Sequence, residues 1–126
     1  MNIAPSLQAL DALAVQLMVT ANNVANVNTE KFRASRVDLE DGAQGQGVRV
    51  QDIRRDSAPG PLVPDDPERL AAAGYATAAE GWVRGSNTDL ALEMTWLMRE
   101  EMAYAANLRV LRTGNDMAGG IIELTA

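Results

Sequence analysis

Apolar residues recur along the first third of the chain at alternating steps of three and four. The positions are Leu7, Leu10, Ala14, Leu17, Ala21 and Val24. This spacing is that of heptad positions a and d, which share one face of a helix. Pro5 and Ser6 suit the first turn, because proline is tolerated there and serine caps helix ends. The pattern therefore predicts a helix over residues 6–26.

The last third of the chain carries the same pattern over a greater length. Ser86 and Asp89 precede it at the spacing of a capping box, in which each side chain satisfies a backbone amide of the other residue. The pattern predicts a helix over residues 87–123. Its ten seam positions are Leu90, Met94, Leu97, Glu101, Tyr104, Leu108, Leu111, Asn115, Ala118 and Ile122. Since neither helix can bury its own stripe, the two pack on each other or on other chains.

Two polar residues interrupt the second stripe, and three methionines widen the helix's apolar surface. Glu101 and Asn115 are interpreted as residues that fix register and partner number, with the alternative that Glu101 lies at an exposed edge of the helix. Met94, Met98 and Met102 recur every four residues and predict a flexible apolar face for core or partner packing.

The centre of the chain has a different character from its ends. Residues 42–47 are glycine, glutamine and alanine, which is typical of a flexible connector. Alternating residues from Val48 predict a strand that continues to Arg55, with a phase break near Asp52 that fits a bulge. Further short strands are predicted at residues 62–63 and 73–77. The centre is thus expected to be a small β-rich insert.

Composition narrows the classes of function. Aromatic residues are only 4% of the chain, which favours helices packed at narrow seams over a bulky enzyme core. The formal net charge of −6 argues against nucleic acid as a partner. There is no cysteine and no histidine, which excludes disulfides, thiol nucleophiles and imidazole bases. Asp11 interrupts the first apolar run and no basic segment precedes it, so no cleaved signal peptide is expected.

Acidic pairs do not make a convincing active site in this sequence. Asp65, Asp66 and Glu68 lie in a proline-rich turn, and Glu100 and Glu101 are adjacent on a helix, where neighbouring side chains point apart. No phosphate-cradling glycine loop accompanies them. The sequence therefore predicts no enzyme, no catalytic residue, no metal site, no cofactor and no small-molecule substrate.

Four asparagines, Asn22, Asn23, Asn26 and Asn28, fall within seven positions at the end of the first helical pattern. Asparagine is a mediocre helix former whose amide competes for backbone hydrogen bonds. The cluster is either a surface that hydrogen-bonds to neighbours without charge, or a helix end that passes into a turn.

Two motifs resemble a known family. The segment Ala21–Thr29, followed by Phe32-Arg33-Ala34, resembles the N-terminal signature of the bacterial flagellar basal-body rod and hook proteins. Gly81-Trp82-Val83-Arg84-Gly85-Ser86-Asn87-Thr88-Asp89-Leu90 resembles the second signature of that family, and the likeness continues through Glu93-Met94 and residues 104–107. Together the motifs cover about half of the chain. The short length and small centre resemble the small proximal rod proteins.

The resemblance implies a fold and a role. It implies a mainly α fold in which the terminal heptad helices form an antiparallel coiled-coil hairpin around a small β-rich insert. The expected divisions are residues 1–30, 31–85 and 86–126. Family members pack helically into a hollow rod in the periplasm, within the flagellar basal body. They leave the cytoplasm by the flagellar type III export apparatus without a cleaved signal peptide.

On this basis the expected partners are other rod subunits, further copies of this chain and the export apparatus, and a homo-oligomer in isolation is one expectation. The alternative is a cytoplasmic coiled-coil adaptor or export chaperone. The predicted assembly interface combines the asparagine cluster with the helical seams: Leu10, Leu17, Asn22, Asn23, Val24, Asn26, Asn28, Leu90, Met94, Leu97, Tyr104, Leu108 and Leu111.

One position departs from the pattern of the family. Lys31 stands where its members usually have glycine, in a stretch that reads like Asn-Thr-x-Gly-Phe/Tyr-Lys/Arg-Ala. Without glycine the turn after the asparagine cluster is expected to be less tight.

Overall fold

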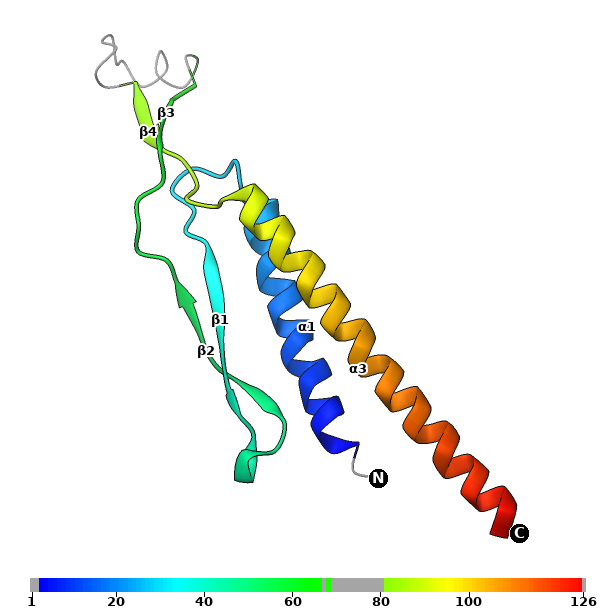
Figure 1. The fold of residues 1–126 in the computed structure, drawn as a ribbon. Coiled ribbons are helices and arrows are strands. Elements are labelled where there is room, and N and C mark those ends of the chain that lie inside the picture. Colours follow the sequence, from blue (N-terminus) through cyan, green and yellow to red (C-terminus); the bar gives the residue numbers. More distant parts are fainter. Residues whose placement is uncertain (1–2, 67, 69–80, 126) are drawn as a thin grey trace.

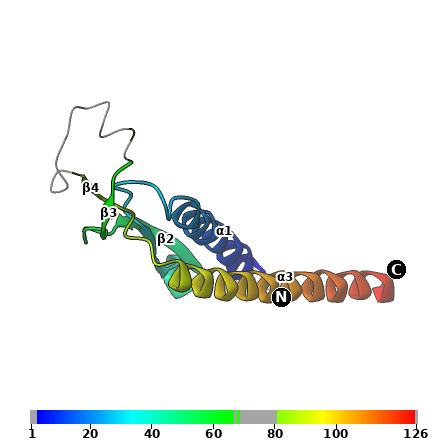
Figure 2. The same cartoon turned by 90° about the horizontal axis from the view of Figure 1, so that it is seen from above.

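The computed structural model describes residues 3–66, 68 and 81–125. Two helices dominate it: α1 covers Ala4–Ala25 and α3 covers Leu90–Thr125. Their bounds lie within three residues of those predicted. At 1.5 Å per residue, α1 is about 33 Å long and α3 about 54 Å. The first part of α3 runs beside α1 in the opposite chain direction, and the rest continues past the start of α1 (Figures 1 and 2).

Two small antiparallel sheets complete the described fold. β1 (Ser35–Asp41) pairs with β2 (Val48–Arg55), and β3 (Leu62–Pro64) pairs with β4 (Trp82–Arg84). The β1–β2 hairpin packs along α1, whereas the β3–β4 pair lies near the start of α3 (Figure 1). The strands at residues 48–55 and 62–63 are therefore confirmed. The strand predicted at residues 73–77 lies outside the described residues.

The phase break near Asp52 is a bulge. Asp38 pairs with Asp52 while the next residue, Leu39, pairs with Val50, so Gln51 is the extra residue of the longer strand. This brings Val48 and Val50 to the side of the hairpin that faces α1, where they line a hollow with Val15. The connector at residues 42–47 is an ordered turn that contains a short 3-10 helix, Ala43–Gly45, and is closed by a Gly42 N–H to Gly47 carbonyl bond.

The prediction of a mainly α fold built on an antiparallel coiled-coil hairpin was wrong. Two sheets are present, and α1 packs against the β1–β2 hairpin as well as against α3. None of the predicted seam residues whose side chains the structure describes is buried, and Leu7, Leu90 and Met94 are more than two-fifths exposed. Heptad spacing shows which residues share a helical face, but it does not show what covers that face.

The described residues contain very little apolar core. Only Ala12 and Ala34 are buried apolar residues. The buried polar residues outnumber them: Thr20, Asn23, Ser86, Glu93 and Glu100. The surface of the chain, 8867 Å², exceeds the roughly 6,500 Å² expected of a compact 13.5 kDa protein. The fold therefore depends on a polar interior and leaves much apolar surface uncovered.

Candidate assembly surface

Asn23 lies at the centre of the polar interior and is 0% exposed. Its Oδ1 accepts a hydrogen bond from the Ser35 N–H at 2.9 Å, and its Nδ2 donates to the Ser35 carbonyl at 2.8 Å. The amide therefore pairs with the first residue of β1 as a neighbouring strand would. Nδ2 also donates to Glu93 Oε2 at 3.2 Å. One side chain thus joins α1, β1 and α3.

Arg36 neutralises the Glu93 carboxylate, which is also 0% exposed. The guanidinium makes two bonds to it: NH1 donates to Oε2 at 2.9 Å and NH2 donates to Oε1 at 2.5 Å. Burying a carboxylate is costly unless it is paired and hydrogen-bonded, and this planar two-point contact meets both conditions. The pair holds β1 to the first turns of α3.

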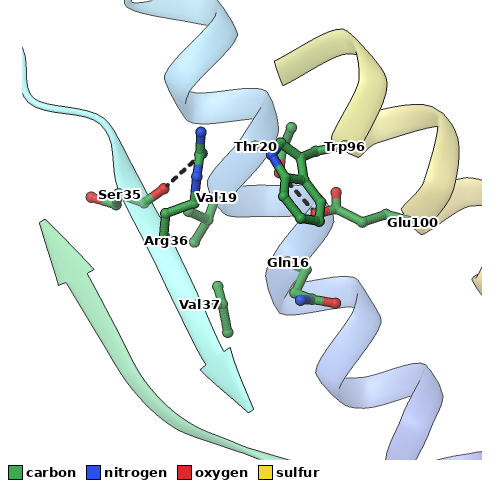
Figure 3. Close-up of a pocket in the computed structure, with 8 residues that line it drawn as sticks. All are labelled: Gln16, Val19, Thr20, Ser35, Arg36, Val37, Trp96 and Glu100. Atoms are coloured by element: carbon green, nitrogen blue, oxygen red, sulfur yellow. Dashed lines mark hydrogen bonds between the residues drawn. The ribbon is translucent and has the colours of Figure 1, made fainter. Parts of the chain in front are cut away.

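A second buried carboxylate, Glu100, lies two turns farther along α3. Thr20 Oγ1 donates to its Oε1 at 3.1 Å (Figure 3). Burial raises the pKa of Glu100 above its ordinary value, the Thr20 bond opposes that change, and the nearby Glu93 charge adds to it. Glu100 and Trp96 line a pocket of about 170 Å³ with residues of α1 and β1 (Figure 3).

The other asparagines of the cluster have different environments. Asn26 follows the last residue of α1, and its Nδ2 donates to the Asn22 carbonyl at 2.9 Å. Thr29 Oγ1 then donates to Asn26 Oδ1 at 3.0 Å, so these residues form the turn after the helix. Asn22 and Asn28 are exposed. Only part of the cluster is therefore a surface, and Asn23 belongs to the interior.

Asn87 performs a similar joining role in the second motif. Its Oδ1 accepts from the Ala34 N–H at 2.7 Å, and its Nδ2 donates to the Ala58 carbonyl at 2.8 Å. The cap of α3 differs from the predicted box: Asp89 Oδ1 accepts from the Leu92 N–H at 3.1 Å, whereas Ser86 Oγ accepts from the Thr88 N–H. Ser86 therefore belongs to a turn before the helix, and Asp89 alone caps it.

Lys31, which stands where glycine was expected, adopts a backbone conformation that favours glycine. Its φ is 58°, in the left-handed region that favours glycine, and its N–H donates to the Arg84 carbonyl at 2.8 Å. That bond ties the first motif to β4. It helps to hold Lys31 in the left-handed conformation although Lys31 has a Cβ. Nearby, a Cβ on Gly60 would collide with the Gly85 carbonyl oxygen. The segments that contain Gly60 and Gly85 approach this closely because Gly60 has no side chain.

Exposed apolar side chains gather on α3. Leu90, Met94, Met98 and Met102 recur every four residues and are between 43% and 66% exposed. They form one continuous strip, which we call the methionine stripe. Its exposure favours partner packing over core packing for these methionines. Glu101 is also exposed, as its edge interpretation expects, and Asn115 is exposed too.

The predicted interface residues therefore separate into three groups. Asn23 is buried, while Asn22, Asn28, Leu90 and Met94 are exposed. The remaining ones are half-buried: Leu10, Leu17, Val24, Asn26, Leu97, Tyr104, Leu108 and Leu111. The sequence interpretation missed Thr20, Arg36 and Glu93. The Glu93–Met94 pair belongs to the second motif, but no spacing rule joins Arg36 to a residue 57 positions away.

Within residues 3–66, 68 and 81–125, no three acidic side chains are grouped so that they could hold a metal ion. No helix in the same residues combines the length and the apolar character needed to cross a bilayer.

Comparison with known proteins identifies the class. Residues 6–33 match the family described as flagella basal body rod protein, and residues 79–124 match the C-terminal part of the flagellar basal body rod FlgEFG proteins. The chain therefore belongs to the family of flagellar basal-body rod proteins and is a structural subunit of the rod. The predicted resemblance and structural role are confirmed, and the adaptor or chaperone alternative is not favoured.

Individual relatives place it among the proximal rod proteins. It is 36% identical over 119 residues to the flagellar basal-body rod protein FlgC of Yersinia enterocolitica, a match that covers 86% of this chain and 84% of that protein. The FlgC protein of Escherichia coli O6:H1 is 33% identical with the same coverage. That of Borreliella burgdorferi is 28% identical over 133 residues, covering 86% of this chain and 85% of that protein.

Proposed function

We propose that the chain assembles with other rod subunits, and with further copies of itself, through the exposed faces of α1 and α3. The methionine stripe supplies the main apolar contact, and the half-buried seam residues flank it. Asn22 and Asn28 add uncharged hydrogen-bonding groups at the end of α1. In this proposal Asn23 positions the elements inside each subunit and does not contact a neighbour.

The uncovered apolar surface carries this proposal. A contiguous apolar strip on a small protein marks a site of interaction, whereas scattered apolar residues need no explanation. Here the strip occupies one helix, while the only apolar residues buried among the described ones are two alanines. Packing against neighbouring helices would provide the apolar core that the isolated subunit lacks.

We also propose export through the flagellar type III apparatus, assembly in the periplasm and a folded state that forms fully only in the rod. A polar interior with few buried apolar groups supports easy unfolding, since apolar burial is the main stabilising contribution to folding. An unfolded chain suits passage through a narrow channel. The divisions at residues 30 and 85 belong to this proposal, with the two ends as assembly segments and the centre as a spacer.

The experiment replaces Met98, which is 54% exposed, with Asp in cells that depend on this protein for motility. We expect Met98→Asp to leave the isolated subunit's circular dichroism unchanged, because the side chain is largely in water. Rod incorporation and swimming should be lost, because a charge cannot be buried between apolar helices without a partner.

Met98→Leu is the matched control, since it changes the shape of the side chain and keeps its apolar character. We expect it to assemble and to support motility. Intact rods that contain the Met98→Asp subunit would contradict the proposal that the methionine stripe is an assembly surface.

A further inference from the structure

Two polar atoms in the polar interior have no hydrogen-bond partner among the described residues: Trp96 Nε1 and Glu100 Oε2. Both atoms are buried, and Glu100 as a whole is only 8% exposed. The first is a donor and the second an acceptor, so each loses hydrogen bonds to water without gaining one from the chain. The described chain supplies no partner for either atom, so both can bond to a group from outside the chain.

The same two residues, Trp96 and Glu100, line two hollows. The pocket of about 170 Å³ is also lined by Arg36 and Val37 of β1 (Figure 3). The second hollow has a volume of about 120 Å³ and is lined by Leu13, Gln16, Trp96, Arg99, Glu100 and Ala103. Each is large enough for one small polar side chain and too small for a helix.

The charges around Glu100 indicate a neutral occupant. The charged groups that act on it are Glu93, Arg36 and Arg99, and the Arg99 guanidinium lies 4.7 Å from the centre of the Trp96 ring. Two carboxylates therefore face two guanidinium groups, and an added ion would leave an unbalanced charge in a buried place. A carboxamide is neutral, and it offers a carbonyl to Trp96 Nε1 and an N–H to Glu100 Oε2.

Asn28 is the one asparagine of the cluster whose side chain makes no hydrogen bond among the described residues. Asn22, Asn23 and Asn26 use their side chains within the chain, whereas Asn28 is exposed. It lies in the turn between α1 and β1, which is narrower than a helix. We infer that the hollow at Trp96 and Glu100 receives the Asn28 side chain of a second copy of this chain. The Asn28 surface of one copy would bind the Trp96 and Glu100 surface of the next. Because these are two different surfaces of the same chain, the contact repeats from copy to copy and builds an extended array.

This inference rests on the proposed assembly of copies, and its test uses the full chain in solution. Sedimentation over rising concentration would compare the wild type with Trp96→Phe, Glu100→Gln and Asn28→Ala. We expect each variant to self-associate about 10-fold more weakly, because one buried partner is left unpaired. Glu100→Gln keeps the shape and the Thr20 bond but presents a donor where the acceptor was. Gln46→Ala, at an exposed carboxamide in the turn between β1 and β2, is the matched control and should associate as the wild type does.

The double variant Asn28→Ala/Trp96→Phe separates a shared contact from independent effects. If the two groups meet, the double variant associates no more weakly than either single one. Wild type that remains monomeric at every concentration, an unaffected Asn28→Ala, or fully additive losses would each overturn the inference. If rods still depend on Met98 while these variants associate normally, the pocket inference fails and the proposed assembly through the methionine stripe stands.

Discussion

Asn23 and Glu93 meet in the interior although 70 residues separate them in the chain, and the Asn23 amide donates to the Glu93 carboxylate at 3.2 Å. Each belongs to a different signature motif of the family, so the two motifs are parts of one hydrogen-bonded network. Arg36, which lies in neither motif, neutralises the charge. The motifs therefore serve the internal fold of the subunit as well as its surface.

Replacing Asn23 with Ala should lower the free energy of unfolding by about 2–3 kcal/mol. The substitution leaves the Ser35 N–H without its partner, leaves the Ser35 carbonyl with the Arg36 bond alone, and removes a donor from Glu93. Urea unfolding followed by circular dichroism would measure the change. Asn22→Ala, at an exposed position in the same helix, should change it by less than about 0.5 kcal/mol. Equal effects of the two substitutions would contradict the internal role of Asn23.

Removing the cation from the interior should be more harmful than removing both charges. Arg36→Met leaves the fully buried Glu93 carboxylate uncompensated, and we expect a loss of about 3 kcal/mol in the free energy of unfolding. Adding Glu93→Gln should restore part of that loss, because no buried charge remains. A double-mutant cycle by urea unfolding checks this. Purely additive losses would show that the two side chains do not depend on each other.

Lys31→Gly should stabilise the subunit by about 0.5 kcal/mol. Glycine relieves a left-handed conformation that costs other residues about 1 kcal/mol, and part of that gain is offset by the greater freedom of glycine in the unfolded chain. Lys31→Ala is the matched control: it removes the same side chain but keeps Cβ, so no stabilisation is expected. A thermal unfolding series would compare the three proteins, and a stabilising Lys31→Ala would point to the side chain instead of the backbone.

Glu100 should make stability depend on pH. Because burial raises its pKa in the folded state, the folded protein binds the proton more tightly than the unfolded one, whose ordinary value is 4.5. The contribution of Glu100 to stability is therefore full below about pH 4.5 and falls as the pH rises through the folded-state value.

Unfolding of the wild type and Glu100→Gln between pH 4 and pH 7 would test this. Glutamine does not titrate and keeps an acceptor for Thr20, so the stability of the variant relative to the wild type should increase as the pH rises. A difference that stays constant over this range, or one that moves in favour of the wild type, would show that Glu100 is not desolvated in the folded protein.

Local structure was largely readable from the sequence. Hydrophobic spacing located both helices to within three residues, and broken alternation near Asp52 predicted the bulge that the structure places at the adjacent Gln51. β1 was missed although Val37 and Leu39 alternate with charged residues, which is a weak signal over so short a segment. The cap of α3 was predicted at Ser86, whereas Asp89 caps the helix. Both residues have side chains that can cap, and spacing alone does not choose between them.

By itself the sequence determined the family, the rod role, the helices and an apolar surplus that requires partners, because each depends on residue type and local periodicity. Only the tertiary structure decided that Asn23 faces inward, that Arg36 pairs with Glu93, and that β1 and β2 lie on α1 where a second helix alone was expected. These outcomes depend on contacts between residues far apart in the chain, which a one-dimensional period does not encode. A carboxylate can be buried only where another element of the fold places an opposite charge beside it.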